Sequence, residues 1–215
     1  MSPIEAAHII DDDPSIRSAL TNLVDSVGLT ARAYGSVSEF LDAQNQEGDA
    51  AGCLLLDVQL PGLNGLDFQA RMAEHGLTLP VILMTGHGSI PMSVRGMKAG
   101  AVDFLTKPFA ANEMLEAIGR ALDIDRARRA EAAGDVQVLQ RYETLSKRER
   151  EVMALVTAGM MNKQVGGELG ISQVTVKFHR GAVMRKMGVR SLADLVRLSE
   201  QLQKSGAVEP TGARV

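Results

Sequence analysis

The sequence predicts two domains, an α/β domain built on a five-stranded parallel sheet and then an all-α helix-turn-helix domain of four helices. Three observations support this prediction. Strand and helix patterns alternate strictly over residues 1–122, which is typical of a parallel sheet with helices on both faces. Beyond residue 144 the apolar residues follow helical spacing only. The charge balance also changes, because residues 1–122 carry 7 Lys/Arg and 15 Asp/Glu whereas residues 144–215 carry 12 and 6.

Five short apolar runs are predicted to be the strands of the first domain. The run Gly52–Leu56 is apolar throughout, as expected of a central strand that is buried on both faces. The segments between the runs have the caps, turn residues and apolar spacing of helices. The predicted strands are 8–10, 30–34, 52–56, 80–84 and 102–105, and the predicted helices are 16–27, one around Phe40 and Leu41, 66–74, 89–99 and 112 to about 129.

Four helices are predicted in the second domain, and the first three begin at a polar residue that can cap them. Ser146 and Glu149 have the spacing of a capping box. Gly170-Ile171 is the short connection typical of a helix-turn-helix motif. The expected caps are Ser146, Asn162 and Ser172, and the fourth helix is expected to run from Ser191.

The segment 123–143 is predicted to be a partly helical linker. Residues 126–131 have high helix propensity, and Gly134-Asp135 is expected to interrupt the helix. The resulting boundaries are 1–122 for the first domain, 144–204 for the helix-turn-helix domain and 205–215 for a polar tail that we expect to be disordered.

Composition excludes several classes of protein. Apolar residues make up 45% and charged residues 23%, which is ordinary for a globular chain. No apolar run approaches the roughly 18–20 residues of a membrane span, and no basic stretch precedes an apolar core at the N-terminus. We therefore expect a cytoplasmic protein that has no membrane partner.

Charged and hydroxyl side chains stand where the predicted strands end. Asp11 and Asp12 follow the first strand, Asp57 follows the third, Thr85 ends the fourth and Lys107 follows the fifth. Because the carboxyl ends of parallel strands meet at one edge of the sheet, we expect these side chains to converge. Clustered carboxylates suit a hard cation such as Mg²⁺, which can offset their charge when an anionic phosphoryl donor approaches.

The second domain is basic, and one predicted helix carries much of that charge. Lys177, Arg180 and Lys186 lie on it, away from its apolar residues. Ser172 and Thr175 stand near its start, where a helix N-terminus also favours phosphate. Such a helix suits the major groove of double-stranded DNA.

Four segments of the first domain resemble the signature blocks of response-regulator receiver domains; they are 9–14, 56–65, 84–88 and 104–109. The resemblance implies a flavodoxin-like fold and phosphorylation of Asp57 by a sensor histidine kinase. It implies Mg²⁺ held by Asp12, Asp57, the backbone carbonyl of Gln59 and, through water, Asp11. Lys107 and Thr85 are implied to bind the phosphoryl group, and Phe104 to reorient with Thr85.

Segments 145–152, 169–180 and 184–191 resemble the LuxR-type DNA-binding domain, so the whole chain resembles the FixJ/NarL class of response regulators. This resemblance implies that Lys177, Phe178 and Gly181 face bases, whereas His179 and Arg180 lie near the DNA backbone. RNA polymerase and a second copy of the chain are expected partners. Phosphorylation is expected to form the dimer through the face made by the fourth helix and fifth strand of the receiver, where Ile90, Val94 and Met97 follow helical spacing.

Two departures from the LuxR pattern stand out. Gly181 offers no side chain for readout, and Gly166 and Gly167 lie in the first helix of the motif, which indicates close packing or a softer helix. Three other residues are given ordinary roles: Cys53 is expected to be buried, Asp13 to cap a helix and His87 to occupy a variable position.

Two other functions fit parts of the pattern. An aspartate-based phosphohydrolase would use the same aspartate and Mg²⁺, but position 59 is Gln59, which leaves no evident acid or base for turnover. A regulator that senses a small ligand would share the DNA-binding domain, but it needs a largely apolar cleft in place of the acidic pocket.

Overall fold

The computed structural model describes residues 5–47 and 51–206. The chain forms two compact units, Met1–Arg129 and Ala130–Val215. The predicted tail at 205–215 lies outside the described residues from position 207 onward. Across the described ranges, no helix is both long enough and apolar enough to cross a membrane.

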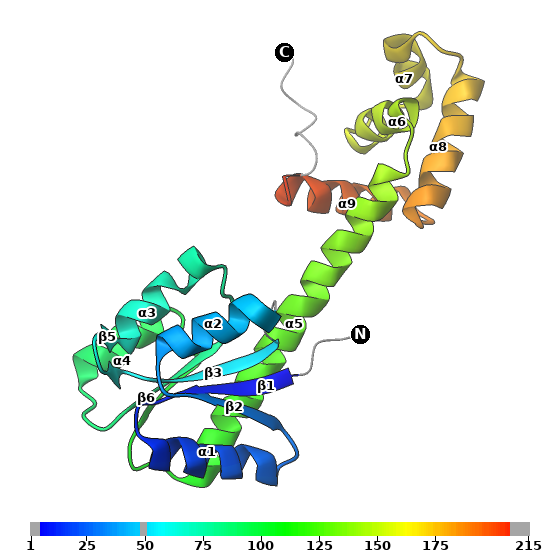
Figure 1. Cartoon of the computed structure of the whole chain (residues 1–215). Helices are drawn as coiled ribbons and strands as arrows, with labels where there is room; N and C mark the ends of the chain where they lie inside the picture. The colour runs from blue at the N-terminus through cyan, green and yellow to red at the C-terminus, as the bar shows by residue number, and fades with distance from the viewer. Residues whose placement is uncertain (1–4, 48–50, 207–215) are drawn as a thin grey trace. The chain divides into compact units, whose positions relative to one another are not determined.

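The first unit contains the predicted five-stranded parallel sheet, with strand order β2-β1-β3-β6-β7 (Figure 1). This order puts β3 at the centre, in agreement with its continuous apolar sequence. A separate two-stranded ladder joins β4 to β5 just after β3. The strands are β1 Glu5–Ile10, β2 Thr30–Tyr34, β3 Ala51–Asp57, β4 Gln59–Leu60, β5 Leu63–Asn64, β6 Val81–Thr85 and β7 Asp103–Thr106.

Helices cover both faces of the sheet. Side chains alternate between the two faces along β3, and their contacts show which helices lie on each face. Cys53 and Leu55 pack in one core with residues of α1 and α5, whereas Leu54 and Leu56 pack in a second core with residues of α2 and α3. Burial raises the pKa of the Cys53 thiol to about 12, so it stays protonated and packs as an apolar group. The helical segments are α1 Pro14–Ser26, α2 Val37–Glu47, α3 Gly65–Arg71, the 3-10 turn η1 Met72–His75, α4 Ile90–Lys98 and α5 Ala111–Glu143.

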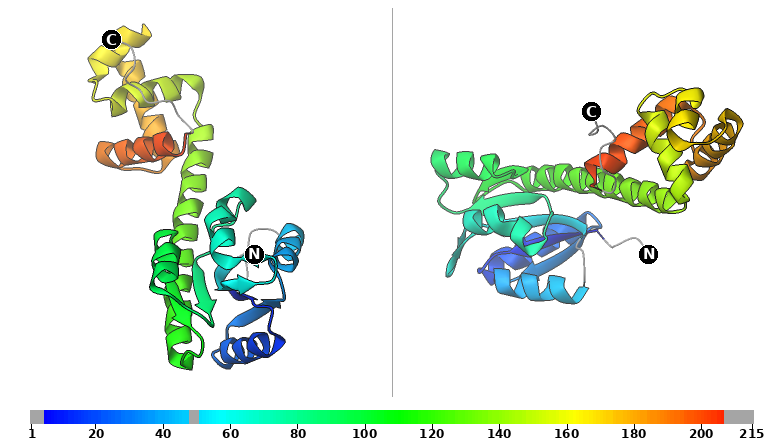
Figure 2. Two further views of the ribbon diagram at one scale, coloured as in Figure 1. Left: turned by 90° about the vertical axis from the view of Figure 1, so that its left-hand side faces the viewer. Right: turned by 90° about the horizontal axis from the view of Figure 1, so that it is seen from above.

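The predicted break in the linker is wrong, because α5 continues through Gly134 as one helix of 33 residues (Figure 2). A glycine costs about 1 kcal/mol relative to alanine inside a helix. The flanking segments are rich in Ala, Arg and Glu, whose helix propensities outweigh one such residue. Buried Asp125 also anchors the helix to the sheet, because its carboxylate accepts a hydrogen bond of 2.9 Å from the backbone N–H of Gly52.

The second unit contains four further helices, as predicted: α6 Lys147–Thr157, α7 Asn162–Leu169, α8 Gln173–Met187 and α9 Leu192–Lys204. One core joins α6, α8 and α9 through Met153, Met187 and Leu195. The end of α5 also belongs to it, because Val138 and Tyr142 pack there. The segment expected to be linker therefore supplies part of the C-terminal core.

Two of the three predicted caps are confirmed in this unit. Ser146 and Ser172 each accept a backbone hydrogen bond at a helix start, and Ser191, which was not predicted as a cap, does the same at α9. Asn162 was expected to cap α7 and does not; Met161 occupies the cap position, with its N–H bonded to Gln164 Oε1 at 2.8 Å. The side-chain amide oxygen of Asn162 instead accepts a hydrogen bond from the guanidinium of Arg180.

Only one of the two unusual glycines of α7 is required by close packing. A Cβ at Gly166 would lie 2.7 Å from the backbone oxygen of Ile171, in the turn that leads to α8. A Cβ at Gly167 would meet nothing within 4 Å. The close approach of α7 to the turn therefore depends on Gly166.

Candidate functional site

The carboxyl ends of the strands bring three aspartates together. Asp57 is the last residue of β3, and Asp11 and Asp12 follow β1 directly. One carboxylate oxygen from each lies within 4.8 Å of the others. Asp11 and Asp57 are buried and Asp12 is exposed, so the cluster opens to solvent on the side of Asp12. Three carboxylates at this spacing form a donor set of hard oxygens, which is the ligand chemistry that Mg²⁺ prefers.

Lys107 joins the cluster from the loop after β7. Its Nζ donates to Asp11 Oδ2 at 2.5 Å and to Asp57 Oδ2 at 2.6 Å. The remaining oxygen of Asp57 accepts the backbone N–H of Gln59 at 2.9 Å, which ties the β3–β4 turn to the site. The ammonium thereby offsets two buried negative charges that would otherwise repel each other.

The pKa directions follow from this arrangement. Burial raises the pKa of Asp11 above its usual range, although the Lys107 hydrogen bond acts in the opposite direction. Burial also acts to lower the pKa of Lys107, but its hydrogen bonds to Asp11 and Asp57 outweigh that effect and the pKa is raised. Lys107 is therefore firmly protonated, and it brings a fixed positive charge to the place where an anion would approach Asp57.

The loop after β1 is held by interactions that the sequence analysis only partly foresaw. Asp13 caps α1 as expected, accepting from the backbone N–H of Ser15 at 2.7 Å. Arg17 was not singled out, yet its guanidinium donates to the backbone oxygens of Asp11 at 2.7 Å and Asp12 at 3.0 Å. These bonds orient the backbone that carries both carboxylates, and no sequence pattern marked Arg17 for this role.

A close approach on the other side of Asp57 also depends on a glycine. A Cβ at Gly65 would lie 2.3 Å from the backbone oxygen of Asp57 and 2.9 Å from Val58 Cα. The turn chemistry of 61–65 was recognised in the sequence, but its contact with Asp57 was not. Gly65 lets the start of α3 pack directly against the end of β3.

Thr85 and Phe104 lie on the neighbouring strands β6 and β7. Thr85 ends β6 and is buried, and its hydroxyl accepts the backbone N–H of His87 at 3.2 Å. Phe104 is half-buried on β7 and packs against the core that includes α2 and α3. A Cβ at Gly88 would lie 2.9 Å from Thr106 Oγ1 and 3.4 Å from side-chain atoms of both Thr85 and Phe104, so the backbone of Gly88 approaches these side chains closely. The side chain of His87 is exposed.

The fourth helix of the first unit presents an apolar surface. Ile90 is 80% exposed, and Val94 and Met97 are each nearly half exposed. Their spacing puts them on one side of α4. These are the three residues that the sequence analysis assigned to dimer formation.

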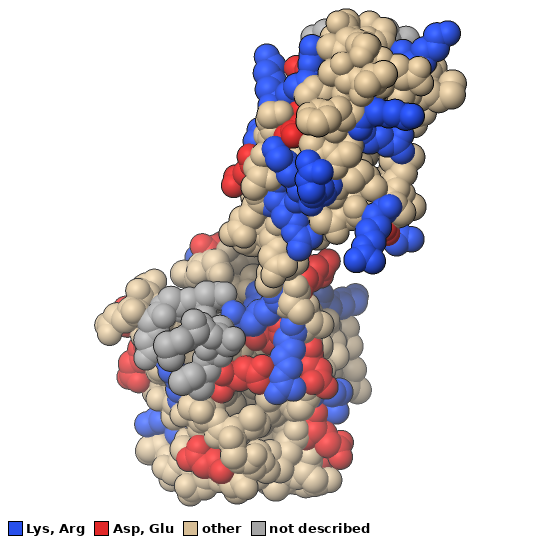
Figure 3. Space-filling model, turned by 90° about the vertical axis from the view of Figure 1, so that its right-hand side faces the viewer, with Lys and Arg blue, Asp and Glu red and all other residues tan. Residues whose placement is uncertain are grey.

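The second unit carries the basic surface, and Figure 3 shows Lys and Arg side chains gathered on the face of it that is in view. Lys177 and Phe178 are both exposed on α8, and His179 and Arg180 are half-buried. Arg180 donates to Asn162 Oδ1 on α7 at 3.1 Å. At the start of α8, the hydroxyls of Ser172 and Thr175 lie 2.8 Å apart, and Ser172 also caps the helix.

Lys186 differs from the other predicted DNA contacts. Its Nζ donates to Glu149 Oε2 at 2.6 Å and to the backbone oxygen of Thr144 at 3.1 Å. The same Glu149 oxygen accepts the backbone N–H of Ser146 at 2.7 Å, so Lys186 completes the cap of α6. The hydrogen bond from Lys186 lowers the pKa of Glu149. This lysine is engaged in joining α8 to α6.

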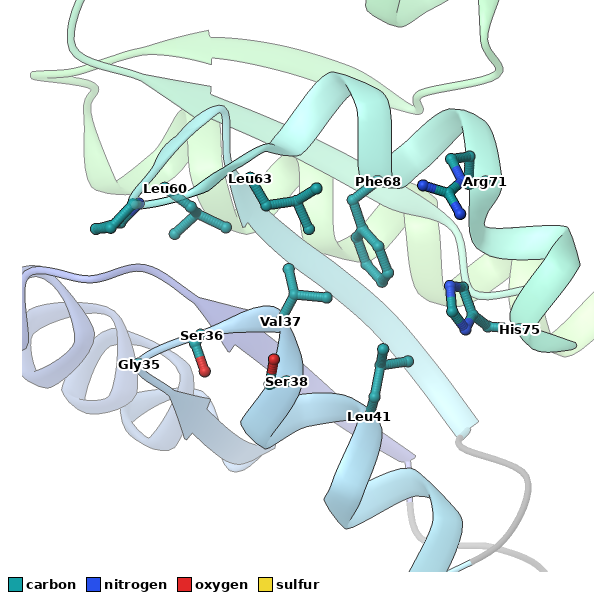
Figure 4. A pocket seen from close by; sticks show the side chains of 11 residues that line it. Gly35, Ser36, Val37, Ser38, Leu41, Leu60, Leu63, Phe68, Arg71 and His75 are labelled. Carbon is teal, nitrogen blue, oxygen red and sulfur yellow. The ribbon is translucent and has the colours of Figure 1, made fainter.

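A small pocket lies elsewhere in the first unit, between the start of α2 and the β4–β5–α3 segment (Figure 4). Its volume is about 260 Å³, slightly below the roughly 300–1,000 Å³ of typical small-molecule sites. Val37, Leu41 and Phe68 form apolar walls, and Arg71 and His75 stand at one end. None of the predicted site residues lines it.

Comparison with known families matches both units. Residues 7–119 match the response regulator receiver domain, and residues 143–199 match the bacterial regulatory proteins of the luxR family. Nodulation protein W of Bradyrhizobium diazoefficiens is 52% identical over 194 residues, which cover 90% of this chain and 85% of that protein.

Two solved structures extend the similarity across both units. The response regulator StyR is 41% identical with a TM-score of 0.79, covering 92% of this chain and 98% of StyR. Full-length FixJ from B. japonicum is 36% identical with a TM-score of 0.56, covering 94% of this chain and 99% of FixJ.

Proposed function

Because the chain belongs to the response regulators that join a receiver domain to a LuxR-type DNA-binding domain, we propose that phosphorylation of Asp57 controls its binding to promoter DNA. The protein is a phosphorylation-dependent transcriptional regulator from a non-enzymatic family, unlike the phosphohydrolase alternative. Residues 7–119 match a receiver domain, which argues against the alternative of a regulator that senses a small ligand. Acting on DNA, the protein is proposed to work in the cytoplasm.

The observation that carries the proposal is the position of Asp57 among groups of both charges. Its carboxylate lies 2.6 Å from the Lys107 ammonium and within 4.8 Å of oxygens from Asp11 and Asp12. A phosphorylated histidine of a sensor kinase is the proposed donor. An oxygen of Asp57 attacks the phosphorus, the P–N bond breaks, and the imidazole leaves with the electron pair, which yields an aspartyl phosphate.

The neighbours of Asp57 have distinct proposed roles. Asp12, Asp57 and the Gln59 carbonyl would hold Mg²⁺, with Asp11 acting through water, and the bound ion would offset the negative charge of the carboxylates and phosphate. Lys107 binds a phosphate oxygen and so leaves its present bond to Asp57. The Thr85 hydroxyl turns from the His87 N–H toward the phosphoryl group.

The response to phosphorylation is proposed to pass from Thr85 to Phe104 and then to the surface of α4. Both side chains approach Gly88, which has no side chain of its own to hinder their movement. Ile90, Val94 and Met97 would then form the interface of a two-fold dimer. Such a dimer would bind DNA with two-fold related half-sites and would present one surface to RNA polymerase.

DNA contacts are proposed along α8. Lys177 and Phe178 reach bases, His179 and Arg180 lie near the phosphate backbone, and the start of the helix with Ser172 and Thr175 binds phosphate. Residues 144–215 carry 12 Lys/Arg and 6 Asp/Glu, which favours a polyanion. Lys186 contributes less, because Glu149 already neutralises it.

Incubation with acetyl phosphate and Mg²⁺ tests the acceptor. The wild type should gain one hydroxylamine-labile phosphoryl group by intact-mass spectrometry, and Asp57→Asn should gain none. Asp42→Asn, which changes an exposed aspartate of α2, is the matched control and should label normally. Full labelling of Asp57→Asn, stable to hydroxylamine, would refute the assignment.

A further inference from the structure

Two large apolar side chains project from the first half of α8 into solvent. Val174 is 77% exposed and Phe178 is 73% exposed. They are four residues apart, so they lie on one side of the helix, one turn above the other. The other large apolar residues of α8 pack into the cores of this unit, where Val176, Val183 and Met187 are buried and Met184 is partly buried. The fold of this unit therefore does not account for Val174 and Phe178.

We propose that Val174 and Phe178 form an apolar subsite that recognises the C5-methyl groups of thymine in the major groove. The inference rests on the proposed DNA contacts of α8 and extends them from Phe178 to Val174, which the sequence analysis did not single out. Lys177 lies between the two in the sequence and is exposed, so a cation stands beside the apolar pair. A cation beside an apolar pair suits the major groove, where phosphates line the sides and base edges are exposed between them.

The surroundings of the pair let it approach base edges. The Ser172 hydroxyl accepts the Thr175 N–H at 3.1 Å, which fixes the start of α8. The Phe178 ring packs edge-on against His179, with centroids 6.0 Å apart, which restrains its orientation. One turn further on, a Cβ at Gly181 would meet nothing within 4 Å. Gly181 offers no side chain for readout, but it also adds no bulk in the middle of α8. The first half of α8 can therefore insert more deeply into the major groove.

The chemistry of the two side chains selects among base pairs. Thymine presents a methyl group in the major groove, whereas cytosine presents an amino donor and guanine presents two acceptors. Val174 and Phe178 can satisfy neither donors nor acceptors, and an unpaired polar group that is buried against them is unfavourable. The pair therefore favours thymine at one or two positions of each half-site.

The test uses the full-length protein activated with beryllofluoride and Mg²⁺. Sites are first selected from randomised duplex DNA, and each thymine of the enriched half-site is then replaced singly by uracil. Uracil keeps the pairing with adenine and the O4 acceptor but lacks the methyl group. At one or two positions we expect affinity to fall about 4-fold, the equivalent of one buried methyl group at about 0.8 kcal/mol.

Variants assign that effect to the two side chains. Val174→Ala and Phe178→Gln should each bind thymine and uracil sites equally at the position they contact, whereas Phe178→Leu should keep most of the preference. Val136→Ala alters an exposed apolar residue of α5, outside the proposed DNA contacts, and should behave as the wild type.

The outcomes separate this inference from the proposed function. Enriched sites that bind equally well with uracil at every thymine, or uracil sensitivity that persists in both Val174→Ala and Phe178→Gln, would overturn the thymine subsite and leave DNA binding standing. Failure to select any DNA site would overturn both.

Discussion

The Lys107 ammonium donates a hydrogen bond of 2.6 Å to Asp57 Oδ2, although the two residues are 50 positions apart in the sequence. The sheet order explains the contact, because β7 lies two strands from β3 and both end at the same edge. The same ammonium bonds to Asp11, so one cation holds two buried carboxylates. In the proposed mechanism the Lys107 ammonium exchanges its hydrogen bond to Asp57 for one to an oxygen of the phosphoryl group.

Lys107→Ala should therefore separate phosphorylation from its effect on DNA binding. Asp57 and the other carboxylates remain, so Mg²⁺ binding should be largely intact and labelling by acetyl phosphate should still occur. The phosphoryl group then lacks its cation. The increase in operator affinity on phosphorylation should therefore be at least about 10-fold smaller in the variant than in the wild type. Mass spectrometry and DNA titration of the same sample measure both, with Lys204→Ala on α9 as the exposed-lysine control. A normal rise in affinity for Lys107→Ala would contradict this role.

Dimer formation should depend on the exposed side of α4. Val94→Glu puts a charge in the proposed interface, where burying it without a partner is unfavourable. With beryllofluoride and Mg²⁺, the wild type should sediment as a dimer at tens of micromolar and Val94→Glu as a monomer. Val27→Glu, at a position 49% exposed after α1, should dimerise as the wild type does. Equal dimerisation of all three proteins would place the interface elsewhere.

Lys186→Met should lower stability more than it changes DNA recognition. The substitution removes a 2.6 Å hydrogen bond between the partly exposed Lys186 and the buried Glu149, an interaction that contributes about 1 kcal/mol. That change corresponds to a melting temperature lower by roughly 4–8 °C for a domain of this size. The slope of log affinity against log salt should hardly change, whereas Arg180→Met, at the proposed phosphate contact, should flatten it by about one unit. A Lys186→Met variant of full stability with a flatter slope would identify Lys186 as a phosphate contact.

Acid should destabilise the receiver domain through His8. Burial first, and then the charge of Arg32, lowers the pKa of His8 to about 4 from an ordinary value near 6.5. Between these values the unfolded chain binds a proton that the folded chain excludes, so stability falls as pH drops from 6.5 toward 4. The loss is about 3 kcal/mol at most.

An NMR titration of His8 and urea unfolding at pH 7.5, 6.5, 5.5 and 4.5 measure this effect. His8→Leu should lose stability less steeply on acidification than the wild type, while exposed His87→Gln should follow the wild type. A His8 pKa near 6.5 would remove the basis of the prediction.

The sheet and its acidic edge could be predicted because they depend on local patterns. Apolar runs mark the strands, and parallel strands must bring Asp11, Asp57 and Lys107 to one edge regardless of their separation in sequence. The interruption at Gly134 was wrong because one glycine is a weak signal beside the strong helix formers around it. Lys186 was predicted to contact DNA and Asn162 to cap a helix, but partners distant in the sequence, Glu149 and Arg180, engage them.

Exposure was the property that the sequence predicted least well. Valine is a residue type that is common in protein cores, and only the packing of α8 shows that Val174 is exposed to solvent. Arg17 binds backbone oxygens, which carry no side-chain pattern that could have indicated the contact. Such roles are set by three-dimensional neighbours and were accessible only from the structure.

The central claim is that one carboxylate, Asp57, couples phosphorylation to DNA binding. The most direct test is the affinity of wild type and Asp57→Asn for a selected operator, each measured with and without beryllofluoride and Mg²⁺ at one fixed salt concentration. The account predicts an increase of at least about 10-fold in affinity for the wild type and no change for Asp57→Asn. An equal increase in both proteins, or no increase in a wild type shown by mass spectrometry to accept a phosphoryl group on Asp57, would contradict it.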